Sequence, residues 1–124
     1  MTIDIDALLE QEEVVLAPER GTFDTAAIGQ HIGTIGAAWN DPVRPEVWLV
    51  FADDDARQAF VDTFDPAGPK QYPYVLLFEV RPATLYANLF AGEEVFPLAR
   101  ALLQWLTGTW ACKVVEPGTE EPPA

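Results

Sequence analysis

The chain has 124 residues, of which 49% are hydrophobic and 22% charged, a composition typical of one folded domain. Twenty acidic residues face seven basic ones, so the formal net charge is −13 at pH 7. A negative field of this size repels nucleic acid and anionic membranes, so it argues against both as partners and favours a basic one.

The charge is unevenly distributed along the chain. Residues 1–65 hold fourteen acids and three arginines, a net charge of −11. Residues 66–124 hold six acids and four bases, a net charge of −2. A basic partner is therefore expected to meet mainly the first half of the chain.

Several chemistries are excluded by the residue types that the chain lacks. It contains no serine, one histidine (His31) and one cysteine (Cys112), so a Ser-His-Asp triad, a His/Cys metal cluster and an internal disulfide are all excluded. The acidic N-terminal residues lack the pattern of a signal peptide, and no stretch approaches 18 uninterrupted apolar residues. We expect a soluble cytoplasmic protein.

The first predicted elements are a short helical turn, a strand and a longer helix. The turn spans residues 6–11 with Asp6 as N-cap, and the strand spans residues 12–17 and stops at Pro18. The longer helix begins at Thr25 after the N-cap Asp24 and continues to about Trp39. Its apolar face is predicted from the helical spacing of Ile28, Ile32, Ile35 and Trp39.

The same helix carries a second stripe formed by Gly29, Gly33 and Gly36. Each glycine weakens a helix by about 1 kcal/mol relative to alanine, so close packing is expected to offset the loss. The packing surface is either the sheet of the same chain or a second copy of the protein. The second alternative predicts a homodimer through this helix.

The sequence from residue 46 onward predicts more strands than helices. Residues 46–52 form a strand that is apolar on both faces after its first residue, which indicates a central position in a sheet. A helix with Ala56, Phe60 and Phe64 on its buried face follows. The remaining expected elements are strands at 74–80 and 84–90, a helix with Pro97 in its first turn and Gly108 as C′ residue, a strand at 110–115, and a disordered acidic, Pro-rich tail at 116–124.

This order of elements predicts an α+β fold. We expect one compact domain over residues 1–115, with a mixed sheet of four or five strands and two to three helices packed mainly on one face.

Asp53, Asp54 and Asp55 follow the central strand and are the best candidates for chemistry. Clustered carboxylates could hold Mg²⁺ in a small carboxylate enzyme, and Asp-x-Asp after an apolar strand resembles the haloacid-dehalogenase type. Arg57 stands where that family has a small or hydroxylated residue, and the chain is too short for its core. The alternative is that one aspartate caps the next helix and the others favour its positive end.

Glu12 and Glu13 form a second candidate, at the start of the first strand. They are either a solvated edge that resists aggregation or part of a surface for a basic partner. His31 is expected at the surface or boundary of its helix rather than as a catalytic base, since a base needs a positioned partner. Cys112 is expected to be a small core residue.

The closing helix–strand unit, LARALLQWLTGTWACKVVEP, and the small acidic character of the chain resemble the bacterial immunity proteins that neutralise polymorphic or contact-delivered toxins. The resemblance implies a non-catalytic inhibitor without a cofactor. Its acidic residues, Glu12, Glu13 and Asp53 to Asp55, would cover the basic active site of a toxin or other nucleic-acid-binding protein. The alternatives are the carboxylate enzyme and a homodimeric accessory subunit.

Overall fold

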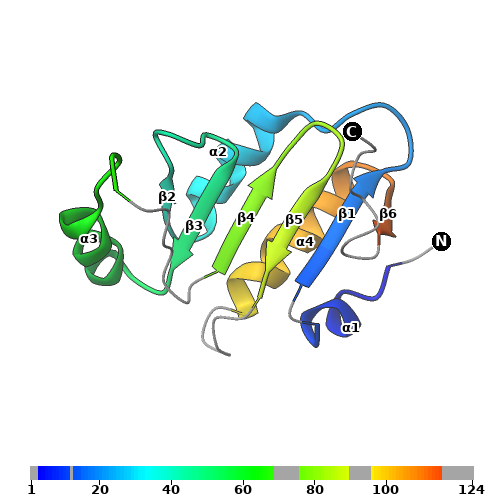
Figure 1. Ribbon diagram of the computed structural model, residues 1–124. Helices are drawn as coiled ribbons and strands as arrows, with labels where there is room; N and C mark the ends of the chain where they lie inside the picture. The colour runs from blue at the N-terminus through cyan, green and yellow to red at the C-terminus, as the bar shows by residue number, and fades with distance from the viewer. Residues whose placement is uncertain (1–2, 12, 69–75, 90–95, 116–124) are drawn as a thin grey trace.

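The fold is built on one open sheet of six strands. The computed structural model describes residues 3–11, 13–68, 76–89 and 96–115. Within these residues the strand order is β2-β3-β4-β5-β1-β6, and every neighbouring pair is antiparallel (Figure 1). The strands are β1 (Glu13–Pro18), β2 (Ala37–Asn40), β3 (Val47–Phe51), β4 (Leu76–Val80), β5 (Leu85–Asn88) and β6 (Cys112–Val115).

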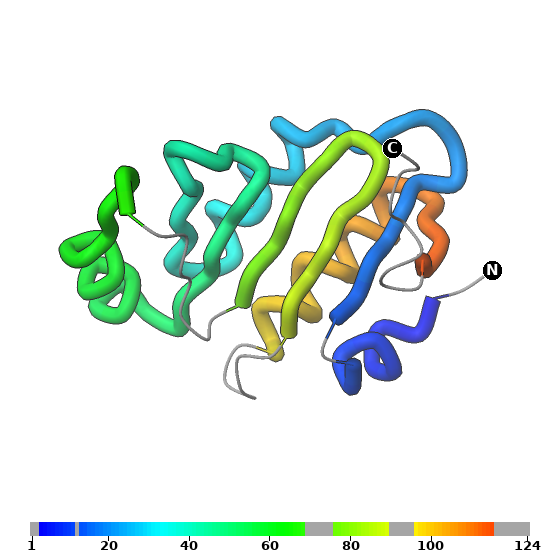
Figure 2. The backbone as a smooth tube through the Cα atoms, in the orientation of Figure 1, coloured from blue at the N-terminus to red at the C-terminus, as the bar shows by residue number. Residues whose placement is uncertain are grey.

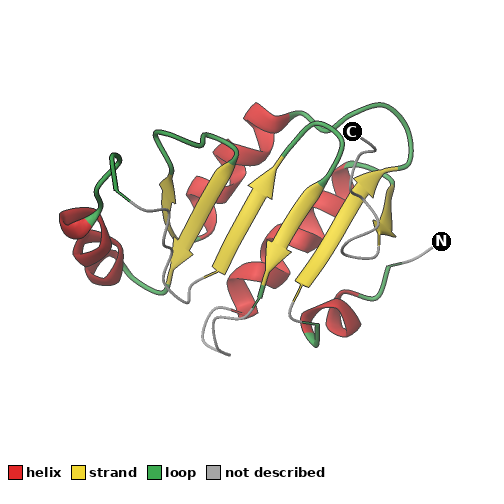
Figure 3. Ribbon diagram, in the orientation of Figure 1, coloured by secondary structure: helices red, strands yellow, loops and turns green. Residues whose placement is uncertain are grey.

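Two of the four described helices cover one face of this sheet. α2 (Thr25–Ile35) and α4 (Phe96–Thr109) lie side by side behind the strands in Figure 3 and contact each other. α1 (Ile5–Leu9) packs against α4, and α3 (Asp54–Thr63) contacts β2 and β3 at the far end of the sheet. None of the described helices is long and apolar enough to cross a membrane.

The core fills the space between the sheet and the two covering helices. β4 and β5 alternate buried and half-buried residues, the pattern of strands with one face on a core. α2 contributes Ile28 and Ile32, and α4 contributes Leu102, Leu103 and Leu106, all fully buried. Opposite them, the strands bury a continuous apolar layer: Val14, Leu16, Val50, Leu76, Phe78, Val80, Leu85 and Ala87.

α3 packs through aromatic rings rather than through a buried face. The ring of Trp39 in β2 meets the rings of Phe60 and Phe64 edge-on, each at a centroid distance of 4.8 Å. Phe51 of β3 extends the cluster toward Phe60 at 5.6 Å. No residue of α3 is buried, so the predicted buried face of this helix is only half covered.

The predicted α+β class is confirmed, but the predicted sheet was wrong in two respects. The sheet has six strands instead of four or five, and its described pairings are all antiparallel instead of mixed. The described residues contain four helices rather than two or three. The expected tail at residues 116–124 lies outside the described residues.

The additional strand is β2, whose residues lie in the predicted helix that continues to about Trp39. Trp39 keeps the helical spacing of the isoleucines, yet α2 ends at Ile35. Gly33 and Gly36 weaken the last turn, and residues 37–40 gain a full ladder of pairs with β3. Trp39 then packs on α3 instead of on the helical face.

The predicted helix boundaries were partly right. Asp24 caps α2 through its Oδ1, which accepts a hydrogen bond from Ala27 N at 3.1 Å. The N-cap of α1 is Asp4 rather than Asp6, and α4 continues through Gly108 to Thr109. Pro97 does lie in the first turn of α4.

Candidate binding surface

Much of the negative charge lies on one side of the sheet, at the ends of the strands rather than along an edge strand. Because neighbouring strands are antiparallel, β3 and β5 end at this edge and β1 and β4 begin there. α1 precedes β1 and α3 follows β3, so both helices add acids to it. We call it the acidic edge and define it by Asp4, Asp6, Glu10, Glu13, Asp53, Asp54 and Asp55. With Arg57 and Arg100 included, these described residues carry a net charge of −5.

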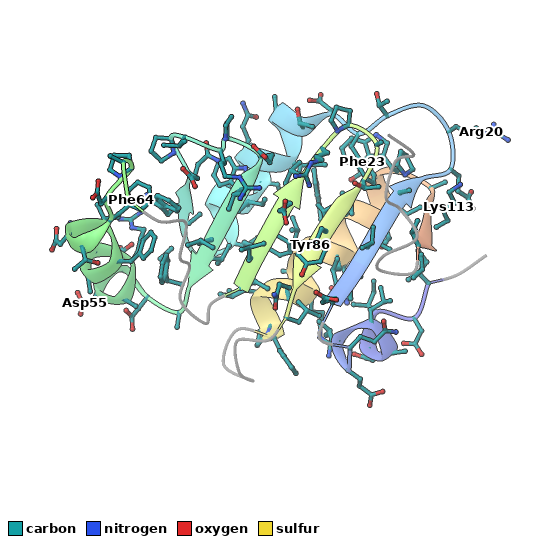
Figure 4. The ribbon with its side chains drawn as sticks, viewed as in Figure 1. Arg20, Phe23, Asp55, Phe64, Tyr86 and Lys113 are labelled. Atoms are coloured by element: carbon teal, nitrogen blue, oxygen red, sulfur yellow. The ribbon has the colours of Figure 1, made fainter. Side chains whose placement is uncertain are left out.

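The opposite edge is close to neutral. It consists of the connections at residues 19–24, 41–46 and 81–84, which hold four acids and three arginines, a net charge of −1. Figure 4 shows Asp55 and Arg20 at opposite ends of the molecule. The uneven charge along the sequence therefore becomes, in the described residues, an uneven charge between two edges.

Asp53, Asp54 and Asp55 stabilise the start of α3. Asp53 is the N-cap, and its Oδ1 accepts a hydrogen bond from Ala56 N at 2.8 Å. Asp54 forms an ion pair with Arg57 at 3.2 Å, and both Asp54 and Asp55 stand in the positive first turn. The capping alternative is thus what the contacts show. In the described part of the chain, no group of three or more His, Cys, Asp or Glu residues could hold a metal ion.

Glu13 is exposed but is anchored to the neighbouring strand. The hydroxyl of Tyr86 in β5 donates a hydrogen bond to Glu13 Oε1 at 2.9 Å. Burial of the phenol, assisted by the bond to Glu13 and its negative charge, raises the pKa of Tyr86 to about 12. Three strand spacings of about 4.8 Å separate β1 from β3, so Glu13 and Asp53 share an edge without forming one cluster. Glu12 lies outside the described residues.

A groove runs along α2 and is floored by Trp48 of β3. We call it the Trp48 groove. Its first hollow, of about 530 Å³, lies at the N-terminal half of α2 and is lined by residues including Ala26, Gln30, Glu46, Val80 and Arg81. Its second hollow, of about 540 Å³, lies at the C-terminal end and is lined by residues including Gly33, Gly36, Asp53, Asp54 and Arg57. Trp48 lines both hollows.

The glycine stripe of α2 forms one wall of this groove. A Cβ atom on Gly29 would lie 2.8 Å from Cζ2 of Trp48, and one on Gly36 would lie 3.1 Å from Val50. The prediction of close packing on the sheet is therefore confirmed at these two positions. A Cβ on Gly33 would meet nothing within 4 Å, so this glycine opens directly into the second hollow.

His31 of α2 packs on α4, and Cys112 of β6 lies in the core. The imidazole of His31 stacks on the indole of Trp105, with centroids 4.1 Å apart and planes 8° apart. Cys112 is buried, as expected for a small core residue, and burial raises the pKa of its thiol. A raised pKa keeps the thiol protonated, which is the opposite of what a nucleophilic cysteine needs.

The sequence does not predict Trp48 at a groove, because residues 46–52 are apolar on both faces after the first and indicate a central core strand. The signal for a neighbour was present in the glycine stripe, since such a stripe requires something to pack against it. Comparisons with protein-family models, with curated proteins and with solved structures found no significant match to this chain.

Proposed function

We propose that this protein is a non-catalytic acidic binding protein that inhibits a basic partner, in the manner of an immunity protein covering the active site of its toxin. The observation that carries the proposal is the acidic edge, which holds seven carboxylates and two arginines along one side of the sheet. Complementary charge of this kind accelerates the encounter with a basic partner and fixes its orientation.

The contacts of the acidic edge support binding more than catalysis. Asp53 is occupied by the helix cap, Asp54 by Arg57, and Glu13 by Tyr86. Carboxylates held by their own chain form a fixed pattern of negative charge, which suits recognition. A basic nuclease or another nucleic-acid-binding protein presents the matching surface, because its substrate is a polyanion.

The test compares two variants with equal charge but different placement. The acidic-edge variant carries Glu13→Gln and Asp55→Asn. The matched control carries Glu19→Gln and Asp24→Asn on the opposite edge, and Asn retains the cap of α2. Each basic protein encoded by a neighbouring gene is tested for binding by surface plasmon resonance over a range of salt concentrations.

We expect the acidic-edge variant to associate roughly tenfold more slowly at low salt, with a weaker salt dependence, because electrostatic steering is lost. The matched control should keep most of the wild-type association rate. Equal effects of the two variants, or no binding at low salt, would refute the proposal.

A further inference from the structure

We infer that the Trp48 groove binds an extended segment of the basic partner, with an apolar side chain in the first hollow and an arginine or lysine in the second. The inference deepens the proposed function and rests on it for the basic character of the partner. It depends on three observations: the charge of each hollow, the half-buried indole of Trp48 that lines both, and the spacing along α2.

The two hollows differ in charge. In the first, Arg81 forms ion pairs with Glu46 at 3.6 Å and with Glu79 at 2.8 Å, so its cation is already compensated within the protein. The rest of its lining includes the apolar groups of Ala26, Val80 and Pro82. This hollow suits an apolar side chain.

The second hollow is negative and is contiguous with the acidic edge. Asp53 and Asp54 outweigh Arg57 by one charge among the residues that line it. α2 ends here without a basic residue in its last turn, so the negative end of the helix dipole is not compensated locally. Asp54 is paired with Arg57 at 3.2 Å, so the uncompensated charge of this hollow is that of Asp53, whose Oδ1 also accepts the cap bond from Ala56 N.

Trp48 provides a contact that both side chains can share. Its indole is half-buried, with one side packed on the backbone of Gly29. A cation beside an indole face gains a cation–π interaction in addition to its ion pair, and an apolar side chain gains buried area. The structure thus favours a cation on one side of Trp48 and an apolar group on the other.

The spacing of the hollows sets the spacing of the ligand groups. The α2 residues that line the first hollow, 25–30, are centred about seven positions before Gly33 and Gly36. Seven helical residues span about 10 Å. In a polyproline II segment, side chains three residues apart point the same way at about 9 Å, so a Leu-x-x-Arg sequence fits both hollows.

The test uses a defined probe, the peptide acetyl-Pro-Leu-Pro-Pro-Arg-Pro-amide, titrated into the ¹⁵N-labelled protein. The indole N–H signal of Trp48 is assigned with Trp48→Phe and followed by NMR, with Trp39, Trp105 and Trp110 as internal references. We expect a saturable shift of the Trp48 signal alone. Replacing the arginine of the peptide by its neutral isostere citrulline should weaken binding about tenfold, as should a scrambled peptide with leucine and arginine adjacent.

The matched protein variants are Gly33→Leu and Thr34→Leu. Both add the same side chain to exposed positions of α2 and change no charge, but only the first fills the second hollow. We expect Gly33→Leu to weaken binding at least tenfold and to unfold at a temperature no lower than wild type, because it replaces a helix-weakening glycine. Thr34→Leu should bind as wild type does.

An unmoved Trp48 signal, equal binding of the arginine and citrulline peptides, or full binding to Gly33→Leu would overturn the inference. Failure here is distinguishable from failure of the proposed function. If the basic protein binds Gly33→Leu normally but discriminates the two edge variants, the groove is wrong and the acidic edge stands. If the peptide binds the groove and no basic protein is bound, the groove stands and the proposed function of the acidic edge is wrong.

Discussion

The same substitution, glycine to alanine, should stabilise the protein at one position of α2 and fail to do so at another. Removing a glycine from a helix interior stabilises the helix by about 1 kcal/mol. At Gly33 the added methyl meets nothing within 4 Å, and its φ lies outside the left-handed region, so the whole gain should appear as stability. At Gly29 the methyl would lie 2.8 Å from the indole of Trp48, which must shift.

Forcing extra volume into a packed contact costs about 1–3 kcal/mol. Gly29→Ala is therefore expected to be neutral or up to about 2 kcal/mol destabilising, because the helix gain offsets part of this cost. The two variants should differ by about 1–3 kcal/mol, or roughly 4–12 °C in melting temperature for a domain of this size. Urea denaturation followed by far-UV circular dichroism measures both free energies of unfolding directly.

A third variant tests the contact between Gly29 and Trp48 directly. In a Trp48→Phe background the smaller ring leaves room, so Gly29→Ala should recover most of its helix gain. Equal stabilities of the two alanine variants in the wild-type background would refute the packing argument. So would an unchanged cost of Gly29→Ala after Trp48 has been shortened.

Three further predictions concern single side chains. Tyr86 should titrate near pH 12, above an ordinary tyrosine, and Glu13→Gln should lower that pKa in ultraviolet titration. Since the pKa of Tyr86 is raised in the folded state, the stability linked to its protonated hydroxyl is fully present below pH 10 and is lost as the pH rises toward 12. Asp53→Ala should cost about 1 kcal/mol in chemical denaturation and Asp53→Asn much less, and equal losses would show that the cap is unimportant. Cys112 should resist Ellman's reagent in the native protein and react fully in urea, and rapid native reaction would contradict its burial.

Local features of this fold could be predicted from the sequence. The capping of α2 by Asp24 and of α3 by an aspartate of the 53–55 group depends on residues within one turn of each other. The class of the fold follows in the same way from short periodic patterns. Each of these predictions uses interactions that span only a few positions of the chain.

Features that depend on distant residues could not be predicted. Trp39 has the spacing of a helical residue, and its place in a strand is explained by its pairing with Leu49 of β3 and its contacts with Phe60 and Phe64. The Trp48 groove depends on Gly29 meeting a residue nineteen positions away in the sequence. The charge imbalance of the acidic edge could be predicted from the sequence, but which acids lie on the same side of the sheet depends on the strand order.

The position of β1 has a consequence for how the chain folds. β1 lies between β5 and β6, and Val15 pairs with Tyr86 on one side and with Val115 on the other, a separation of 100 residues. β2 to β5, in contrast, follow one another along the chain and across the sheet (Figure 2). During synthesis β1 can therefore pair with β5 only after residues 85–88 have emerged and with β6 only at the end, while the meander from β2 to β5 can assemble without β1. We expect hydrogen exchange during refolding to protect β3 and β4 first, and β1 and β6 together at the end.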